Sequence, residues 1–275
     1  VGQWEQWFLL CICALSSWLL VSSAAPESRI AGGVPAAIGD HPYVVAYTYY
    51  YPGIGITIQR CVGVLISSWH SLTSGYCYNG AVLGNIQVRA GSTNSLLGGT
   101  LVNVREFVRP PGYTDVPRSN DIAVTFLQTA LGITNTINVL YIPPQNMYIP
   151  DGQSFRVVSW GFETSGPQLE TLKTVLLNKI NIDVCQAAYN DIENVAITDG
   201  VICATAPSQG ICFGDSGAPL VMDNVVVGIS SFYQGCGIDE YPDVFSRVDS
   251  HTNWILEVAT AGRSGSGIRV APSTK

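Results

Sequence analysis

The chain has 275 residues and a formal net charge of −7, from 20 acidic and 13 basic side chains. Hydrophobic residues make up 47% of the sequence and charged residues only 12%, a composition that supports a core and excludes a disordered or coiled-coil chain. The excess of acidic side chains argues against binding to a nucleic-acid phosphate backbone, so we expect no nucleic-acid partner.

The first element along the chain is an apolar segment, residues 7–20, which is followed by small residues around Ala24. Its length and flanks are typical of a secretory signal peptide, residues 1–24, whereas the segment is short for a membrane span. Because the chain starts at Val1 rather than at Met, we expect the beginning of this signal to be missing. The sequence therefore predicts a secreted, extracellular protein with a short propeptide at 25–29 and no membrane association once the signal is removed.

The rest of the chain is rich in strand and turn residues. Runs containing Val, Ile, Thr and Tyr are short, and turns of Gly, Pro and Asn separate them. The strand-like runs are residues 43–50, 61–66, 100–108, 122–127, 154–160 and 225–229. A series of this kind is typical of closed all-β barrels.

Two segments are predicted to be helical. The stronger prediction covers about 250–260, which carries an apolar face and which Asp249 or Ser250 would cap at its N-terminus. A shorter helix at 182–190 would be opened by Asp183.

Six cysteines remain after removal of the signal peptide: Cys61, Cys77, Cys185, Cys203, Cys212 and Cys236. An even number in a secreted chain predicts a disulfide framework, but six cysteines allow fifteen connectivities and their spacing does not choose among them. No C-x-x-C pair occurs, and the three histidines (His41, His70 and His251) lack the spacing of metal ligands. We therefore expect no metal site and no cofactor.

Four motifs follow one another along the chain: Arg29-Ile30-Ala31-Gly32-Gly33, Leu72-Thr73-Ser74-Gly75-Tyr76-Cys77, Asn120-Asp121-Ile122-Ala123 and Cys212-Phe213-Gly214-Asp215-Ser216-Gly217-Ala218-Pro219-Leu220. In this order and spacing they closely resemble the trypsin/chymotrypsin family of serine proteases. The resemblance extends from Ile30 to about Ala259.

The resemblance implies an all-β fold of two packed antiparallel Greek-key β-barrels (chymotrypsin-like) with a C-terminal α-helix. The protease domain would cover 30–259, with barrels at about 30–140 and 150–248 joined by the Pro-rich residues 140–152. Residues 260–275 are predicted to form a flexible tail. In this family the cysteines would pair as Cys61–Cys77, Cys185–Cys203 and Cys212–Cys236.

The same resemblance assigns catalytic roles. Ser216 matches the nucleophile, Asp121 matches the carboxylate that orients the base, and the N–H groups of Gly214 and Ser216 match the oxyanion hole. A serine hydroxyl becomes an effective nucleophile only when a neighbouring base accepts its proton. The family has Ala-Ala-His-Cys where this chain has Ser74-Gly75-Tyr76-Cys77, so Tyr76 stands in the position of the base.

A tyrosine cannot replace that base. Its usual pKa is about 10, so it is protonated at neutral pH, and the nearby charge of Asp121 would disfavour the phenolate further. No other histidine substitutes, because we expect His70 to be structural and His41 and His251 to lie at the surface. The sequence therefore predicts an inactive centre, unless Tyr76 reflects a sequence error or a rare allele.

The resemblance also implies activation by cleavage. A trypsin-like protease that cuts between Arg29 and Ile30 would release the Ile30 ammonium group, which would pair with the carboxylate of Asp215. That pair would shape the specificity pocket and the oxyanion hole.

Three residues match the walls of the specificity pocket: Gly210, Tyr233 and Asp243. Gly210 lacks the acidic floor with which trypsin-like enzymes bind Arg or Lys. Asp243 could supply a negative charge from another wall, unless it is solvated or paired elsewhere. Tyr233 stands where a glycine usually opens the pocket, and we expect it to narrow the entrance.

The leading hypothesis is a secreted, monomeric serine protease homologue that acts by binding protein or peptide ligands. It would serve as a decoy for protease inhibitors, as a cofactor for an active protease, or as a protein that captures a substrate. The alternative is an active digestive endopeptidase that hydrolyses proteins through an acyl-enzyme on Ser216, and the low lysine count weakly favours the gut lumen as its location. A purely structural extracellular protein is disfavoured by the intact Arg29–Ile30 motif.

Overall fold

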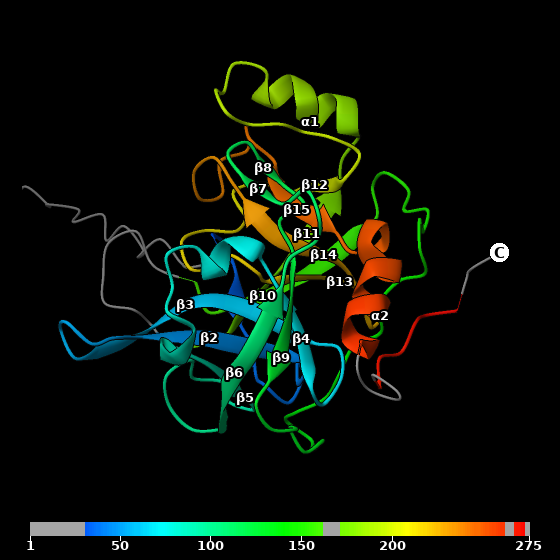
Figure 1. The fold of residues 1–275 in the computed structure, drawn as a ribbon. Coiled ribbons are helices and arrows are strands. Elements are labelled where there is room, and N and C mark those ends of the chain that lie inside the picture. The colour runs from blue at the N-terminus through cyan, green and yellow to red at the C-terminus, as the bar shows by residue number, and fades with distance from the viewer. Residues whose placement is uncertain (1–30, 162–170, 262–266, 273–275) are drawn as a thin grey trace, which may run out of the picture.

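Figure 1 shows the computed structural model of the chain, which describes residues 31–161, 171–261 and 267–272. The predicted signal peptide and propeptide, together with Arg29 and Ile30, lie outside these residues. Most of the described regular structure is antiparallel β-sheet. The all-β class predicted from the sequence is therefore confirmed.

Six strands close into a first barrel in the order β2-β3-β4-β9-β6-β5. These strands are β2 (Val44–Tyr51), β3 (Ile56–Leu65), β4 (His70–Thr73), β5 (Ile86–Ala90), β6 (Thr100–Val108) and β9 (Ala123–Leu127). Alternation of side chains explains how they form a barrel. Along β5, Ile86, Val88 and Ala90 are buried, whereas Gln87 and Arg89 between them are half-buried, as expected for a strand with one face toward a core.

The second unit is a seven-stranded sheet in the order β1-β11-β10-β13-β14-β15-β12, in which β11 also pairs with β12. Six of its strands therefore close into a second barrel. The strands are β1 (Val34–Pro35), β10 (Ser154–Ser159), β11 (Lys173–Lys179), β12 (Val201–Thr205), β13 (Pro219–Met222), β14 (Val225–Phe232) and β15 (Asp243–Arg247). One buried cluster contains Val64 and Leu72 of the first barrel with Val157 and Ile229 of the second, so the two barrels share a core.

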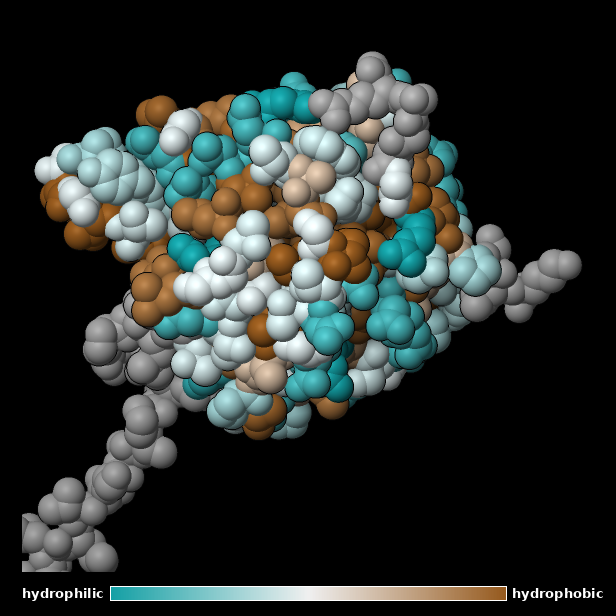
Figure 2. Space-filling view, turned by 90° about the horizontal axis from the view of Figure 1, so that it is seen from below, coloured by the Kyte–Doolittle hydropathy of each residue, from teal (hydrophilic) through white to brown (hydrophobic). Residues whose placement is uncertain are grey.

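The strand β3 begins before the predicted run at 61–66. Its first residues pair with the end of β2, with Ile56 opposite Tyr51. The hairpin that results projects from the first barrel (Figure 1), and apolar surface is visible on the projecting part (Figure 2). Ile54 and Ile56 are 68% and 48% exposed. The residues of β3 that precede the predicted run include the exposed Ile56 and Thr57.

Both predicted helices are present, but the residues that cap them differ from the prediction. The helical elements are α1 (Ile182–Tyr189), α2 (Thr252–Thr260), and the 3-10 turns η1 (Gly75–Tyr78), η2 (Leu83–Asn85) and η3 (Asp249–His251). Asn181 caps α1 by accepting the Asp183 N–H at 2.9 Å, so Asp183 lies in the first turn. No side chain caps α2. Arg247 binds both carboxylate oxygens of Asp249 at 2.9 Å, which removes the predicted cap.

Part of the predicted tail is held against the rest of the fold. Ile142, in the linker between the barrels, forms a parallel bridge with Val270. The Ile142 N–H donates to the carbonyl oxygen of Arg269 at 3.0 Å, and the Ala271 N–H donates to the carbonyl oxygen of Ile142 at 2.9 Å. Residues 267–272 are therefore fixed to the linker, where the sequence predicts flexibility.

The three disulfides pair as the resemblance implies. Cys61–Cys77 joins β3 to η1, Cys185–Cys203 joins α1 to β12, and Cys212–Cys236 joins the loop before β13 to the loop after β14. Within the described residues, no helix is long and apolar enough to cross a membrane.

Candidate active site

The site begins at the end of β4, where Ser74 opens the turn η1. Its hydroxyl accepts the N–H of Tyr76 at 3.2 Å, an arrangement that favours a tight turn. The disulfide to Cys61 holds the next residue, Cys77. Across the barrel interface, the Val62 N–H donates to the carbonyl oxygen of Ser216 at 2.9 Å. These contacts fix Tyr76 and Ser216 to one scaffold.

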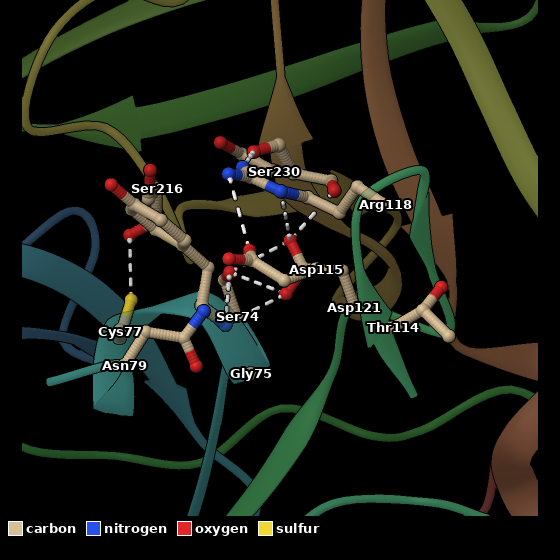
Figure 3. Close-up of polar contacts among 12 residues, drawn as sticks. Ser74, Gly75, Cys77, Asn79, Thr114, Asp115, Arg118, Asp121, Ser216 and Ser230 are labelled. Atoms are coloured by element: carbon tan, nitrogen blue, oxygen red, sulfur yellow. Dashed lines mark hydrogen bonds and ion pairs between the residues drawn. The ribbon is translucent and has the colours of Figure 1, made fainter. Parts of the chain in front are cut away.

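Asp121 lies beneath this turn and is 1% exposed. Its carboxylate accepts hydrogen bonds from the Tyr76 N–H at 2.8 Å and from the Ser231 hydroxyl at 2.6 Å. The Ser74 hydroxyl oxygen lies 2.8 Å from both carboxylate oxygens, and Arg118 Nε lies 3.9 Å from Oδ2. Figure 3 shows Ser74 and Arg118 approaching the carboxylate from different sides. The carboxylate of Asp121 thus receives its hydrogen bonds from groups other than an imidazole.

The pKa of Asp121 reflects a competition between burial and these donors. Burial raises the pKa because it disfavours the charged form, whereas the hydrogen bonds from Ser231, Tyr76 and Ser74 and the charge of Arg118 lower it. Burial is the largest of these effects and the pKa is raised overall.

The side chain of Tyr76 contacts neither catalytic partner through a hydrogen bond. Among the described residues, no such bond joins its hydroxyl to Ser216 or Asp121, and the side chain is 38% exposed. Its ring lies beneath the guanidinium of Arg118, with 4.1 Å between Cζ and the ring centroid, a distance typical of a cation–π contact. The Tyr76 ring therefore packs against the guanidinium of Arg118.

Ser74, Arg118 and Ser231 contact Asp121, and the sequence analysis assigned none of them. Ser74 stands at an alanine position of the family motif, directly before Gly75-Tyr76, and this polar substitution was the available signal. Arg118 lies three residues before Asp121. Nothing in that spacing indicates its contact with Tyr76, because the contact depends on the hairpin of β7 (Thr114–Asp115) and β8 (Arg118–Ser119).

The loop that carries Ser216 is tightly held. Asp215 is fully buried and accepts hydrogen bonds from the Cys212 N–H at 2.8 Å and from the Ser159 hydroxyl. Gln59 donates to the carbonyl oxygen of Gly214 at 2.7 Å. Within the described residues, the N–H groups of Gly214 and Ser216 have no hydrogen-bond partner. These are the two donors that the resemblance assigns to the oxyanion hole.

Ser216 opens into a cleft between the barrels with a volume of about 540 Å³. Aromatic and cationic side chains dominate its walls. The lining residues are Tyr51, Arg60, Tyr76, Arg118, Phe213, Gly214, Ser216, Ser231, Phe232 and Tyr233. The structure thus places the predicted nucleophile, both oxyanion donors, Tyr76 and Tyr233 around one cleft.

The other two predicted pocket residues lie together outside this lining. A Cβ atom added to Gly210 would come within 2.7 Å of Asp243 Oδ2. Asp243 is 4% exposed and accepts the Ile211 N–H at 2.7 Å. Its pKa is raised well above the usual range by burial and by the charge of Asp215. Asp243 is therefore a buried group bound to backbone, not a solvated one.

Tyr233 combines contact with the cleft and proximity to the buried acids. Burial is the main cause of its raised pKa, and the charges of Asp215 and Asp243 add to it. Its ring packs edge-on against Phe213 with centroids 5.9 Å apart. Tyr233 thus lines the cleft and lies close enough to Asp215 and Asp243 for their charges to affect its pKa.

The residues predicted for activation are only partly described, because Arg29 and Ile30 fall outside the structure. The first described residue, Ala31, forms a bridge with Gly210, whose N–H donates to the Ala31 carbonyl oxygen at 3.2 Å. The start of the domain therefore lies beside the loop that leads to Asp215 and Ser216. The pairing of Ile30 with Asp215 stays a prediction.

Among the described residues, no hydrogen bond joins any of the three histidines to Ser216. His70 is buried and bonds to the Ser67 hydroxyl at 2.7 Å, which confirms its structural role. The prediction that His41 and His251 lie at the surface is wrong, since they are only 8% and 7% exposed. Burial lowers the pKa of both imidazoles. Within the described residues, no group of three His, Cys, Asp or Glu side chains could hold a metal ion.

Comparisons with known proteins agree with this geometry. A sequence profile described as Trypsin matches residues 30–255. The alkaline trypsin B of Manduca sexta is 30% identical over 90% of this chain and 97% of its own length. The trypsin of Phaedon cochleariae is 32% identical over 84% of this chain and 89% of its own. The vitellin-degrading protease of Bombyx mori is 31% identical over 91% of this chain and 94% of its own length.

A solved structure shows the same fold. The scabies mite inactivated protease paralogue S-D1 superposes with a TM-score of 0.75 at 22% identity, over 85% of this chain and 98% of that chain. At this identity the likeness concerns the arrangement of strands and helices, and it includes both barrels.

Proposed function

The chain belongs to the trypsin family of serine proteases, and from that premise we propose that it is a secreted family member without peptidase activity that acts by binding proteins or peptides. The observation that carries the proposal is the environment of Asp121. Its carboxylate binds the Ser74 hydroxyl, the Tyr76 N–H and the Ser231 hydroxyl, so no side chain that could accept a proton connects it to Ser216.

The loss of the base has a large expected effect. In the triad of this family, removal of a member leaves only the roughly 10³–10⁴-fold advantage over water that the oxyanion hole and substrate binding provide. Among the described residues, Tyr76 forms hydrogen bonds only through its backbone and none with Ser216. Catalysis by Ser216 would therefore be negligible for digestion.

The specificity pocket presents a second obstacle to substrates. Asp243 is buried next to Gly210 and does not line the cleft, whereas Tyr233 does. A substrate side chain that enters the pocket would have to displace Tyr233. Binding in the remaining cleft is compatible with a role as inhibitor decoy, protease cofactor or capture protein.

The alternative is an active endopeptidase, and one observation favours it. The N–H groups of Gly214 and Ser216 lack partners within the described residues, as a working oxyanion hole requires. The trypsins of Manduca sexta and Phaedon cochleariae are named as proteases, and at 30% and 32% identity this chain shares their family. Against this alternative stands the missing base.

An organophosphate probe distinguishes the two functions. The purified chain is first cleaved after Arg29 by an added trypsin-like protease, which is then removed. We expect no labelling of Ser216 and no hydrolysis of peptide esters above the rate in buffer. Labelling at the rate of an ordinary protease, abolished by Ser216→Ala, would contradict the proposal and establish the endopeptidase.

A further inference from the structure

The cleft above Ser216 carries two arginines and no acidic side chain among its lining residues. Arg60 extends into it from β3 of the first barrel, and Arg118 extends into it from β8. The whole chain has 20 acidic and only 13 basic residues. The charged side chains that line the cleft are therefore positive, whereas the net charge of the whole chain is negative.

Neither guanidinium is neutralised by a close ion pair in the described part of the chain. Arg60 donates to the carbonyl oxygen of Asn79 and lies over the ring of Tyr49. Arg118 lies 3.9 Å from its nearest oxygens on Asp115 and Asp121, well beyond the usual 2.7–2.9 Å of a charge-assisted hydrogen bond. Both guanidinium groups can therefore still bind an anion.

Arg118 also forms a hydrogen bond with a backbone carbonyl group that could otherwise accept an N–H of a peptide ligand. Its Nη1 donates to the carbonyl oxygen of Ser231 at 2.6 Å. Ser231 lies at an irregularity of β14, between the residues Ser230 and Phe232 that pair with β15. The Ser231 carbonyl thus faces Arg118 in the cleft. If the guanidinium turned to an anion, this acceptor would become free for an N–H of an extended peptide.

The remaining donors and walls suit the same ligand. The N–H groups of Gly214 and Ser216 line the cleft without partners in the described residues, and such donors bind oxyanions. Tyr51, Tyr76 and Phe213 provide aromatic surface in the same cleft, which would pack against the backbone and the carbon atoms of a bound chain.

We propose that this cleft binds an acidic peptide segment of a partner protein. The inference rests on the proposed function, a binding protein of this family, and specifies the chemistry of its partner. One carboxylate side chain binds Arg118, which releases the Ser231 carbonyl to accept a peptide N–H, and a second carboxylate binds Arg60. A free dicarboxylate can reach the arginines but cannot supply the N–H, so the peptide binds more tightly than the free anion.

The test uses the whole secreted chain and a fluorescein-labelled alanine hexapeptide with glutamate at its second and fifth positions. Matched hexapeptides carry glutamine or lysine at the same positions, and glutarate serves as the free dicarboxylate. Fluorescence anisotropy measures affinity at low and at physiological salt. We expect the glutamate peptide to bind at least about tenfold more tightly than the glutamine peptide, with a preference that falls as salt rises.

Two variants and a matched control locate the binding site. Arg60→Gln and Arg118→Gln should each weaken binding of the glutamate peptide by about tenfold and leave the glutamine peptide unaffected. Arg118→Lys keeps the charge and should retain the preference for glutamate. The control is Arg105→Gln, because Arg105 lies on β6, is outside the cleft lining and pairs with Glu106. Thermal midpoints confirm that each variant is folded.

The outcomes separate this inference from the proposed function. Equal affinity for the glutamate and glutamine peptides, an equal loss in Arg105→Gln, or glutarate binding as tightly as the peptide would overturn the inference. Mass spectrometry of the same samples reports cleavage. Cleaved peptides would overturn the proposed function alone, whereas intact peptides without a preference for glutamate would leave that function standing.

Discussion

The Ser74 hydroxyl oxygen lies 2.8 Å from both carboxylate oxygens of Asp121. In a working triad the equivalent carboxylate accepts the Nδ1–H of the catalytic imidazole and thereby sets its tautomer. In this chain the Ser74 hydroxyl is one of the donors to the buried carboxylate, together with the Tyr76 N–H and the Ser231 hydroxyl. The buried Asp121 carboxylate is therefore stabilised by a residue two positions before Tyr76.

This relationship determines what restores activity. In Tyr76→His the new imidazole has to compete with Ser74 for Asp121, so we expect the single variant to gain little esterase activity. In Ser74→Ala/Tyr76→His the carboxylate is free to orient the imidazole. We expect the double variant to hydrolyse peptide esters about 10- to 100-fold faster than the single variant, since misplacement of a catalytic group near 1 Å costs a factor of this size.

The pH dependence provides the check on that mechanism. The imidazole accepts a proton only in its neutral form, so the rate of the double variant should rise with pH through a value near 6.5–7. Ser74→Ala alone, with Tyr76 in place, is the matched control and should stay inactive. A single Tyr76→His variant as fast as the double variant would show that Ser74 does not compete for Asp121.

The sequence predicts the framework of the site better than its interior. Ser216 and Asp121 can be assigned from the resemblance because each lies in a contiguous sequence motif. The burial of His41 and His251 was missed, because the exposure of an isolated residue depends on elements distant in the chain. The contact of Arg118 with Tyr76 joins residues 42 positions apart and depends on the β7–β8 hairpin. No periodic pattern in the sequence predicts that hairpin.

The packing around the nucleophile loop predicts a strong effect of one methyl group. Gly217 has a φ of +87°, and a Cβ atom there would overlap the Val62 carbonyl oxygen and the Thr73 hydroxyl. We expect Gly217→Ala to lower the free energy of unfolding by at least about 2 kcal/mol, from backbone strain together with overpacking.

Urea denaturation of the disulfide-intact chain measures this change. The matched control is Gly132→Ala, because nothing lies within 4 Å of a Cβ atom at Gly132, and its effect should stay within about 0.5 kcal/mol. Equal stability of the two variants would mean that the loop and the first barrel do not contact each other closely at Gly217.

Burial of Asp243 predicts a stability that falls with pH. Its folded-state pKa is raised well above the usual value, so the folded chain holds this proton more tightly than the unfolded chain. The resulting contribution is fully present below the unfolded pKa of about 3.9 and is lost as pH rises toward the folded pKa. Asp243→Asn keeps an acceptor for the Ile211 N–H and removes the ionisation.

Thermal midpoints of wild type and Asp243→Asn across pH 4–8 test this expectation. The variant should melt about 2–4 °C higher than wild type at pH 8, and the difference should shrink toward pH 4. Asp151→Asn is the comparison variant. The hydrogen bond from Lys179 lowers the pKa of Asp151, so any effect of this substitution on the thermal midpoint should have the opposite pH dependence. A difference at Asp243 that grows as pH falls would contradict the burial of a neutral acid.

We expect Tyr233 to control whether the buried Asp243 is accessible to a ligand. Because Tyr233 lines the cleft and Asp243 does not, we expect wild type to show no calorimetric binding of benzamidine, a cation that fits acidic pockets. Tyr233→Gly should open the path and give measurable binding. Its affinity should rise with pH, because the cation binds the ionised carboxylate and the pKa of Asp243 is raised. In Tyr233→Gly/Asp243→Asn the affinity for benzamidine should fall at least about tenfold.

The contradicting result is binding of benzamidine to wild type that Asp243→Asn weakens. It would show that Tyr233 leaves the pocket open. The second obstacle to substrates would then disappear, while the missing base remained.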